Sequence, residues 1–122
     1  MRVNDNYPTV NVEAAEKDPN SILHFWRKAI QMRKSEPKLF QRGVFEELDY
    51  DNLKTFSYLK FSEEAEKDSR VVFVILNFSK EAQTFSLPSQ AQDAKLLLGT
   101  VADEHVEEGK LQPYEGRIYL KP

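Results

Sequence analysis

The run Val71–Phe78, VVFVILNF, restricts the fold more than any other stretch of this sequence. Its apolar side chains would fall on both faces of a β-strand, whereas a strand with one face in water alternates apolar and polar residues. The later run Thr84–Leu87, TFSL, does alternate in this way. We therefore expect Val71–Phe78 to be a central strand whose sheet is covered on both faces, and Thr84–Leu87 to lie at an edge.

The hydrophobic pattern changes near residue 40. From Asp18 to Glu36 it has the period of a helix, with Asp18 placed to cap its start, Pro19 at the first helical position and Pro37 placed to end it. After Gly43, short runs rich in Val, Phe, Tyr and Leu are separated by polar turns, which is typical of an antiparallel β-sandwich. The expected strands are Val44–Tyr50, Thr55–Phe61, Val71–Phe78, Thr84–Leu87, Lys95–Thr100 and Arg117–Lys121, with a further short one near Val106 or Leu111.

The sequence thus predicts a mainly β protein, an antiparallel β-sandwich preceded by one long helix. We expect residues 1–40 to form a loop and the helix, and residues 41–122 to form the sandwich domain, with polar loops such as Ser62–Ser69 between strands. At 122 residues the chain is too short for a catalytic (β/α)8 barrel, which takes about 250 residues.

Composition excludes several classes of function. The 17 basic residues face 20 acidic ones and form no basic stripe, so we expect no nucleic-acid partner. No run approaches the roughly 18 apolar residues of a membrane span, and no apolar signal region opens the chain, so we expect a cytoplasmic protein without a membrane partner. With no cysteine, the chain has neither disulfides nor thiolate sites.

The apolar face of the expected helix is unusually wide. Six side chains spread over about 160° of its circumference, more than a helix resting on one surface needs: Ile22, Leu23, Phe25, Trp26, Ala29 and Ile30. We expect the Ile22, Trp26 and Ile30 face to pack on a partner or to drive self-association. Arg33 lies in the middle of this face, where it either extends to solvent from the helix end or pairs with a carboxylate outside this chain.

No catalytic motif stands out. The chain has no glycine-rich phosphate loop and no nucleophile elbow, and its two histidines are far apart. We expect His24 to be a solvated surface residue, and His105, in ADEHVEEG, to lie in a charged turn. Asn77-Phe78-Ser79 matches the glycosylation sequon, but a buried strand is a poor acceptor. The sequence therefore predicts no catalytic, substrate-binding or metal-binding residues and no cofactor.

Five segments together resemble the C-terminal end of the α-glucosidases of glycoside hydrolase family 13, particularly the fungal maltase and isomaltase (oligo-1,6-glucosidase) type. They are VNDNYPTVNVE, DPNSILHFWRKAIQMRKSEPKLF, FEEL, VVFVILNFS and LQPYEGRIYL. The resemblance implies that Val3–Val12 follows the eighth strand of a catalytic barrel, that Asp18–Glu36 is the eighth barrel helix, and that Gly43–Pro122 is domain C of the α-amylase type.

The family hydrolyses terminal α-glucosidic bonds of maltose- and isomaltose-type sugars with retention, using an aspartate nucleophile, a glutamate acid/base and a second aspartate. The resemblance implies that all three belong to a barrel missing from this chain, which alone should be inactive. It also places the loop containing Arg2, Asn4, Asp5 and Tyr7 nearest the active-site mouth, either as rim or as plain turn structure.

Two other classes of function stay open at this point. A free-standing carbohydrate-binding sandwich would need two or three exposed, coplanar aromatic rings. A protein-interaction sandwich would use the apolar helix face as the ligand of a groove on its partner.

Overall fold

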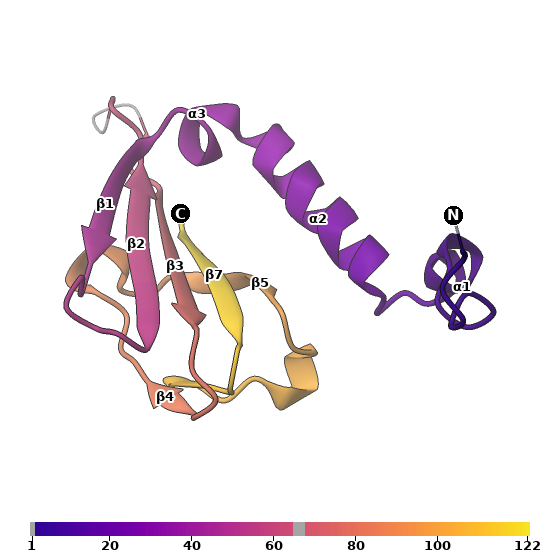
Figure 1. Ribbon diagram of the computed structural model, residues 1–122. Coiled ribbons are helices and arrows are strands. Elements are labelled where there is room, and N and C mark those ends of the chain that lie inside the picture. The colour runs from indigo at the N-terminus through magenta and orange to yellow at the C-terminus, as the bar shows by residue number, and fades with distance from the viewer. Residues whose placement is uncertain (1, 65–67) are drawn as a thin grey trace. The chain divides into compact units, whose positions relative to one another are not determined.

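The computed structural model describes residues 2–64 and 68–122, which form two compact units (Figure 1). The first unit ends at Ser35, and the second begins at Glu36 and ends at Pro122. Part of the expected loop Ser62–Ser69 lies outside the described residues.

The first unit contains helices α1 (Val12–Lys17) and α2 (Ile22–Ser35). Asn11 caps α1, because its side-chain oxygen accepts a hydrogen bond from the backbone N–H of Ala14 at 2.8 Å. None of the described residues in this unit is buried.

The expected helix Asp18–Glu36 begins four residues too early. Asp18 follows α1, and its carboxylate accepts the backbone N–H of Asn20 at 2.9 Å in a local turn. Ser21 instead precedes α2, with its hydroxyl 3.4 Å from the backbone nitrogen of His24. Helix α2 ends at Ser35, one residue before the expected end at Glu36, because Pro37 disfavours helical backbone at the residue that precedes it.

The second unit opens with the short helix α3 (Pro37–Phe40), whose Leu39 and Phe40 are buried. Gly43 joins α3 to the first strand at a point where two stretches of backbone come together. A Cβ atom there would lie against the carbonyl oxygen of Leu39 and 2.8 Å from that of Phe61, so only glycine fits without a shift of the backbone.

A five-stranded antiparallel sheet forms the main layer of this unit, in the order β1-β2-β3-β7-β5 (Figure 1). Its strands are β1 (Val44–Leu48), β2 (Thr55–Phe61), β3 (Val71–Asn77), β5 (Lys95–Gly99) and β7 (Gly116–Lys121). A two-stranded sheet pairs β4 (Gln83–Thr84) with β6 (Lys110–Leu111), and the short helices η1 (Ser89–Ala91) and η2 (Asp103–His105) complete the unit. The mostly antiparallel β architecture expected from the sequence is confirmed.

The strand positions agree with the sequence-based ones to within two residues at each end, except at β4. Of the expected strand Thr84–Leu87, only Thr84 belongs to β4. A two-residue strand at Lys110–Leu111 matches the further short strand expected near Leu111.

Strand β3 is the middle strand of the five, as its sequence predicted. Val72 and Val74 on one face and Phe73 and Ile75 on the other are all buried. Phe73 and Ile75 belong to the core between the layers, which also contains Leu59, Ala91, Leu111 and Tyr119. Both faces of β3 are therefore covered.

Candidate functional site

Potential metal ligands do not gather in the part of the chain that the structure describes. Within residues 2–64 and 68–122, no group of three or more His, Cys, Asp and Glu residues could hold a metal ion. Among the helices of the same residues, none is long and apolar enough to cross a membrane.

The N-terminal loop is held together by its own side chains. Arg2 donates to both carboxylate oxygens of Asp5, at 3.0 and 2.8 Å, and the Asn4 side chain accepts the backbone N–H of Asn6 at 3.2 Å. Tyr7 donates its backbone N–H to the carbonyl of Asn4, and all of these residues are exposed. Their contacts are those of turn structure, one of the two interpretations left open by the sequence.

His24 connects the two helices of the first unit, which the sequence did not predict. Its Nδ1 lies 3.0 Å from the Ser21 hydroxyl and 3.1 Å from the carbonyl of Ala15 in α1. The ring is half-buried, so the expectation of a solvated histidine is wrong. His105, by contrast, is exposed on η2.

The exposed side of α2 is the strongest candidate for a functional surface. Ile22, Trp26 and Ile30, spaced four residues apart on one side of the helix, are 76%, 58% and 47% exposed. We call these three side chains the apolar row. The rings of Trp26 and Phe25 form a T-shaped pair, with centroids 6.4 Å apart and an angle of 79° between the ring planes. Three large apolar side chains in one exposed row are typical of a surface that another surface covers.

One ion pair lies beside this row. Arg27 donates to both carboxylate oxygens of Glu16 in α1, at 2.6 and 2.8 Å. The hydrogen bond from Arg27 holds the pKa of Glu16 below its usual value. The charge of Arg27 is therefore balanced within its own unit.

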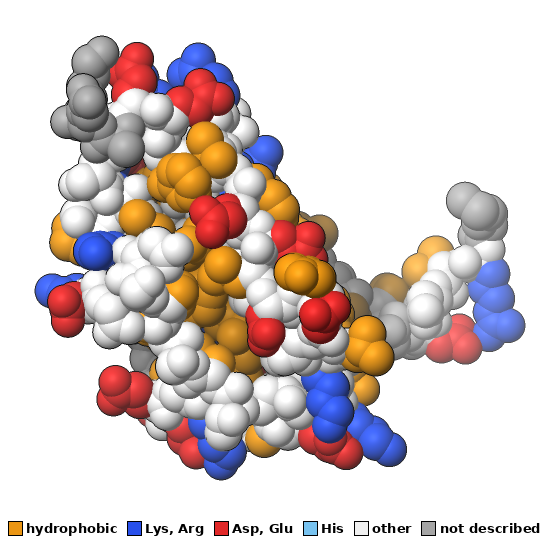
Figure 2. Space-filling model, turned by 90° about the vertical axis from the view of Figure 1, so that its left-hand side faces the viewer, with side chains coloured by type: hydrophobic (Ala, Val, Ile, Leu, Met, Phe, Trp, Pro, Cys, Tyr) orange, Lys and Arg blue, Asp and Glu red, His pale blue; other side chains and the backbone are white. Residues whose placement is uncertain are grey.

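The second unit contains a groove between its layers. Its volume is about 450 Å³, and it is lined by the end of β1, by β2 and β3, and by residues 84–88. Seen from the side on which β1 lies, hydrophobic side chains reach the surface along the middle of the second unit, with acidic ones beside them (Figure 2). Asp49 is the only ionisable residue among the described residues that line the groove. Retaining glycoside hydrolysis needs two carboxyl groups about 5 Å apart, so this groove has no means of performing it.

Aromatic rings on β1 and β2 do not form a flat platform. Phe45 and Tyr58 have centroids 4.9 Å apart but are tilted by 37°, and Phe56 and Tyr58 are tilted by 47° at 5.6 Å. A pyranose ring stacks on coplanar rings, which these are not. The geometry gives no specific support to a carbohydrate-binding role.

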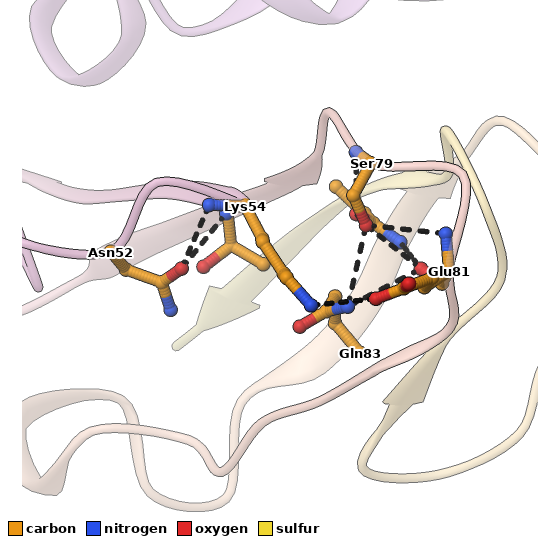
Figure 3. A network of polar contacts seen from close by, with 7 residues as sticks. Asn52, Lys54, Ser79, Glu81 and Gln83 are labelled. Carbon is orange, nitrogen blue, oxygen red and sulfur yellow. Dashed lines mark hydrogen bonds and ion pairs between the residues drawn. The ribbon is translucent and has the colours of Figure 1, made fainter.

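A polar network that the sequence did not reveal fastens the turn after β3 (Figure 3). The amide nitrogen of the buried Asn77 donates to the carbonyls of Glu81 and Gln112, at 2.8 and 2.9 Å. Lys54, the residue before β2, donates to the Glu81 carboxylate at 2.6 Å, and Gln83 donates to the Ser79 hydroxyl at 3.3 Å. Because the Asn77 amide is committed to structure, it is not an accessible glycosylation site.

A fully buried ion pair joins Arg117 of β7 to Glu115, the residue before that strand. Arg117 donates to the carboxylate of Glu115 at 2.5 Å and to the carbonyls of Glu107 and Lys110 at 2.7 and 2.6 Å. The guanidinium also lies 5.7 Å from the centre of the Phe85 ring. Among the described residues, no buried side-chain nitrogen or oxygen lacks a hydrogen-bond partner. This pair holds the second layer on the sheet and serves structure.

No family model matches the chain. Curated relatives do: it is 37% identical to oligo-1,6-glucosidase IMA3 of Saccharomyces cerevisiae over 114 residues, which cover 91% of this chain and 18% of the yeast protein. It is 38% identical to an α-glucosidase of Candida albicans over 120 residues, 98% of this chain and 20% of that protein. The chain thus spans about a fifth of the length of the curated relatives that it matches.

Solved structures show the same relationship. The trehalose-6-phosphate hydrolase of Bacillus licheniformis matches 98% of this chain with a TM-score of 0.79 and 26% identity. The trehalulose synthase MutB of Pseudomonas mesoacidophila matches 99% of it with a TM-score of 0.81 and 26% identity. In both cases the match covers 22% of the larger chain.

Proposed function

Because this chain is homologous to the C-terminal part of the α-glucosidases of glycoside hydrolase family 13, we propose that it is the C-terminal structural domain of such an enzyme. The enzyme would hydrolyse terminal α-glucosidic bonds of maltose- or isomaltose-type oligosaccharides. Its catalytic carboxylates would belong to a (β/α)8 barrel, and this chain would contribute none of them.

The observation that carries the proposal is the extent of the match. It covers 98% of the chain in the Candida albicans relative and in the bacterial hydrolase, so it includes the helical unit as well as the β unit. A free-standing β-sandwich module would account for the second unit alone.

The first unit supports the same proposal. It has no buried residue among those described, so its two helices do not form a core by themselves, and α2 exposes the apolar row. We propose that the catalytic barrel is the partner that covers this row. The cytoplasmic location expected from the sequence remains a prediction.

A chimera tests the proposal. In the Candida albicans α-glucosidase, the segment that this chain matches is replaced by residues 2–122, and hydrolysis of nitrophenyl α-glucoside is compared with that of the same enzyme lacking the segment. We expect the chimera to be folded and active and the truncated enzyme to be neither. An active truncated enzyme, or an inactive chimera, would contradict a structural role for this domain.

A matched pair of variants locates the interface within the chimera. Trp26→Glu introduces a charge into the apolar row, whereas Lys28→Glu changes charge two residues away, about 200° around the helix. We expect Trp26→Glu to reduce the yield of active chimera at least tenfold and Lys28→Glu to leave it nearly unchanged. Equal effects of the two changes would exclude the apolar row as the contact with the barrel.

A further inference from the structure

Two sets of polar contacts among the described residues join α1 to α2. In the first, the hydroxyl of Ser21 donates to the carbonyl of Ala15 at 2.7 Å, and Nδ1 of His24 lies 3.0 Å from that hydroxyl and 3.1 Å from that carbonyl. In the second, Arg27 donates to both carboxylate oxygens of Glu16. Because no described residue of this unit is buried, these contacts, rather than a core, hold α1 on α2.

The first set determines which nitrogen of His24 carries the hydrogen. The Ser21 hydroxyl has one hydrogen, which it donates to the Ala15 carbonyl. A lone pair on Nδ1 would then face the lone pairs of two oxygens, at 3.0 and 3.1 Å, whereas an N–H at Nδ1 donates to them. The contact between His24 and α1 therefore needs an N–H at this position of the side chain.

The loop of residues 2–11 is attached to α1 in turn. Asn11 donates its side-chain amide to the carbonyls of Tyr7 and Pro8, at 2.8 and 3.3 Å, and its side-chain oxygen caps the first turn of α1. The rest of the loop is closed by the turn contacts described above. The shape of the loop thus depends on its own hydrogen bonds, and its position depends on the contacts between α1 and α2.

In a (β/α)8 barrel, the active site is built from the loops that lead from each strand to the following helix. The family resemblance makes α2 the last helix of the proposed barrel, so the segment before α2 would lie at the catalytic face. We propose that Ser21, His24 and Arg27 are positioning residues of the enzyme, which act through α1 to hold the loop of residues 2–11 at the rim of the substrate site. The inference rests on the proposed function and adds residues that determine substrate affinity.

The Michaelis constant separates this role from a purely structural one. A displaced rim loop loses contacts that are made equally to the bound substrate and to the transition state, which raises KM and leaves kcat unchanged. A purely structural contribution instead lowers the fraction of folded enzyme, and with it the yield and the apparent kcat, at constant KM. Both constants are measured on the chimera described above.

Two amide side chains at position 24 give the sharpest comparison. The side-chain nitrogen of asparagine takes the place of Nδ1, whereas that of glutamine lies one bond further from the backbone. For nitrophenyl α-glucoside, we expect His24→Asn to keep KM within about twofold of that of the unsubstituted chimera. His24→Gln and His24→Ala should raise KM about fivefold and change kcat less than about twofold. Unchanged KM in all three variants, or a loss of kcat and yield at constant KM, would overturn the inference.

The pair of Arg27 and Glu16 provides an independent test. Arg27→Glu places two carboxylates together, and like charges repel, so KM should rise about fivefold. The double variant Arg27→Glu and Glu16→Arg restores opposite charges and should return KM to within about twofold of the original value. Lys28→Glu makes the same change of charge at the next exposed position and should leave KM unchanged. A double variant as impaired as Arg27→Glu alone would contradict the positioning role of this pair.

Failure of this inference is distinct from failure of the proposed function. An active chimera in which none of these substitutions raises KM overturns the inference alone. An inactive chimera without any substitution in this chain counts against the proposed function itself.

Discussion

Arg117 is the buried residue that connects the two layers of the second unit. Its side chain is completely buried on β7, and it connects that strand to the backbone of residues 107 and 110 in the second layer. The guanidinium has five N–H groups in a fixed planar arrangement, which suits it to several acceptors at once. The Arg117 side chain thus binds to the main sheet a segment whose own sheet has only two strands, β4 and β6.

Replacing Arg117 by Met should destabilise the chain severely. It leaves the Glu115 carboxylate buried without its charged partner, for which a loss of about 3–5 kcal/mol is typical. The double variant Arg117→Met and Glu115→Gln removes the uncompensated charge and should recover part of that loss. Urea unfolding of the isolated chain measures both, and a single variant as stable as the original would contradict the assigned role.

Asp68 makes the free energy of unfolding depend on pH. Hydrogen bonds from Arg70 lower the pKa of Asp68 from 3.8 to about 2, and Arg70 also pairs with Glu36 at the start of α3. Because the pKa is lower in the folded state, the carboxylate stabilises that state above pH 4, and this contribution is lost as the pH falls from about 4 to about 2.

Asp68→Asn should therefore weaken the dependence of unfolding free energy on pH in this window and lower stability at pH 7. Asp51→Asn, at an exposed turn position, is the matched control for the removal of one carboxylate. Urea unfolding at a series of pH values measures both. Identical slopes for Asp68→Asn and the original chain would show that this carboxylate is not coupled to folding.

Among the helices and strands, α2 determines whether copies of the isolated chain associate. Trp26 is the only tryptophan and lies at the centre of the apolar row. Fully burying an apolar side chain of this size is worth about 1.5–3 kcal/mol, so the exposed row favours association of copies when no better partner is present.

Trp26 fluorescence of the isolated chain should accordingly shift to the blue as protein concentration rises, and Trp26→Glu should yield a monomer whose β unit stays folded. Analytical ultracentrifugation and circular dichroism measure these two properties. A monomer with blue emission at every concentration would mean that the row is covered within the chain, and the proposed barrel interface would lose its physical support.

The strands could be predicted because each is a short apolar run between polar turns. This local pattern locates a strand without knowledge of how the strands pair in the sheet. Helix α1 was missed because its six residues bury none of their side chains, so they leave no periodic apolar pattern. That omission also produced the error at His24, whose hydrogen-bond partner Ala15 belongs to α1.

The apolar row of the candidate surface was predicted from helical period alone. Arg117 and Glu115, two residues apart, were not recognised as a buried pair. Their partners come from residues 107, 110 and 112, and only the folded sheet brings these groups together. Nothing in the sequence pattern marks such a contact.

For the whole molecule, the isolated chain should neither hydrolyse nor bind glucosides. Purified chain should release no nitrophenol from an α-glucoside above a matched blank, because no pair of carboxylates lines its groove. Calorimetric titration with maltose and isomaltose should give no saturable heat at millimolar ligand. Saturable binding would favour the carbohydrate-binding module, and hydrolysis would show that catalytic residues do lie in this chain.

The position of β7 determines when this fold can be completed during synthesis. Its residues 116–121 follow every other strand in the sequence, yet it lies between β3 and β5. While the chain is emerging from the ribosome, β1, β2 and β3 can pair in turn, but β3 keeps an open edge and β5 has no neighbour in the sheet until β7 arrives. The growing chain therefore exposes the unpaired edge of β3 from the synthesis of residue 77 until that of residues 116–121, and an open strand edge is prone to wrong pairing.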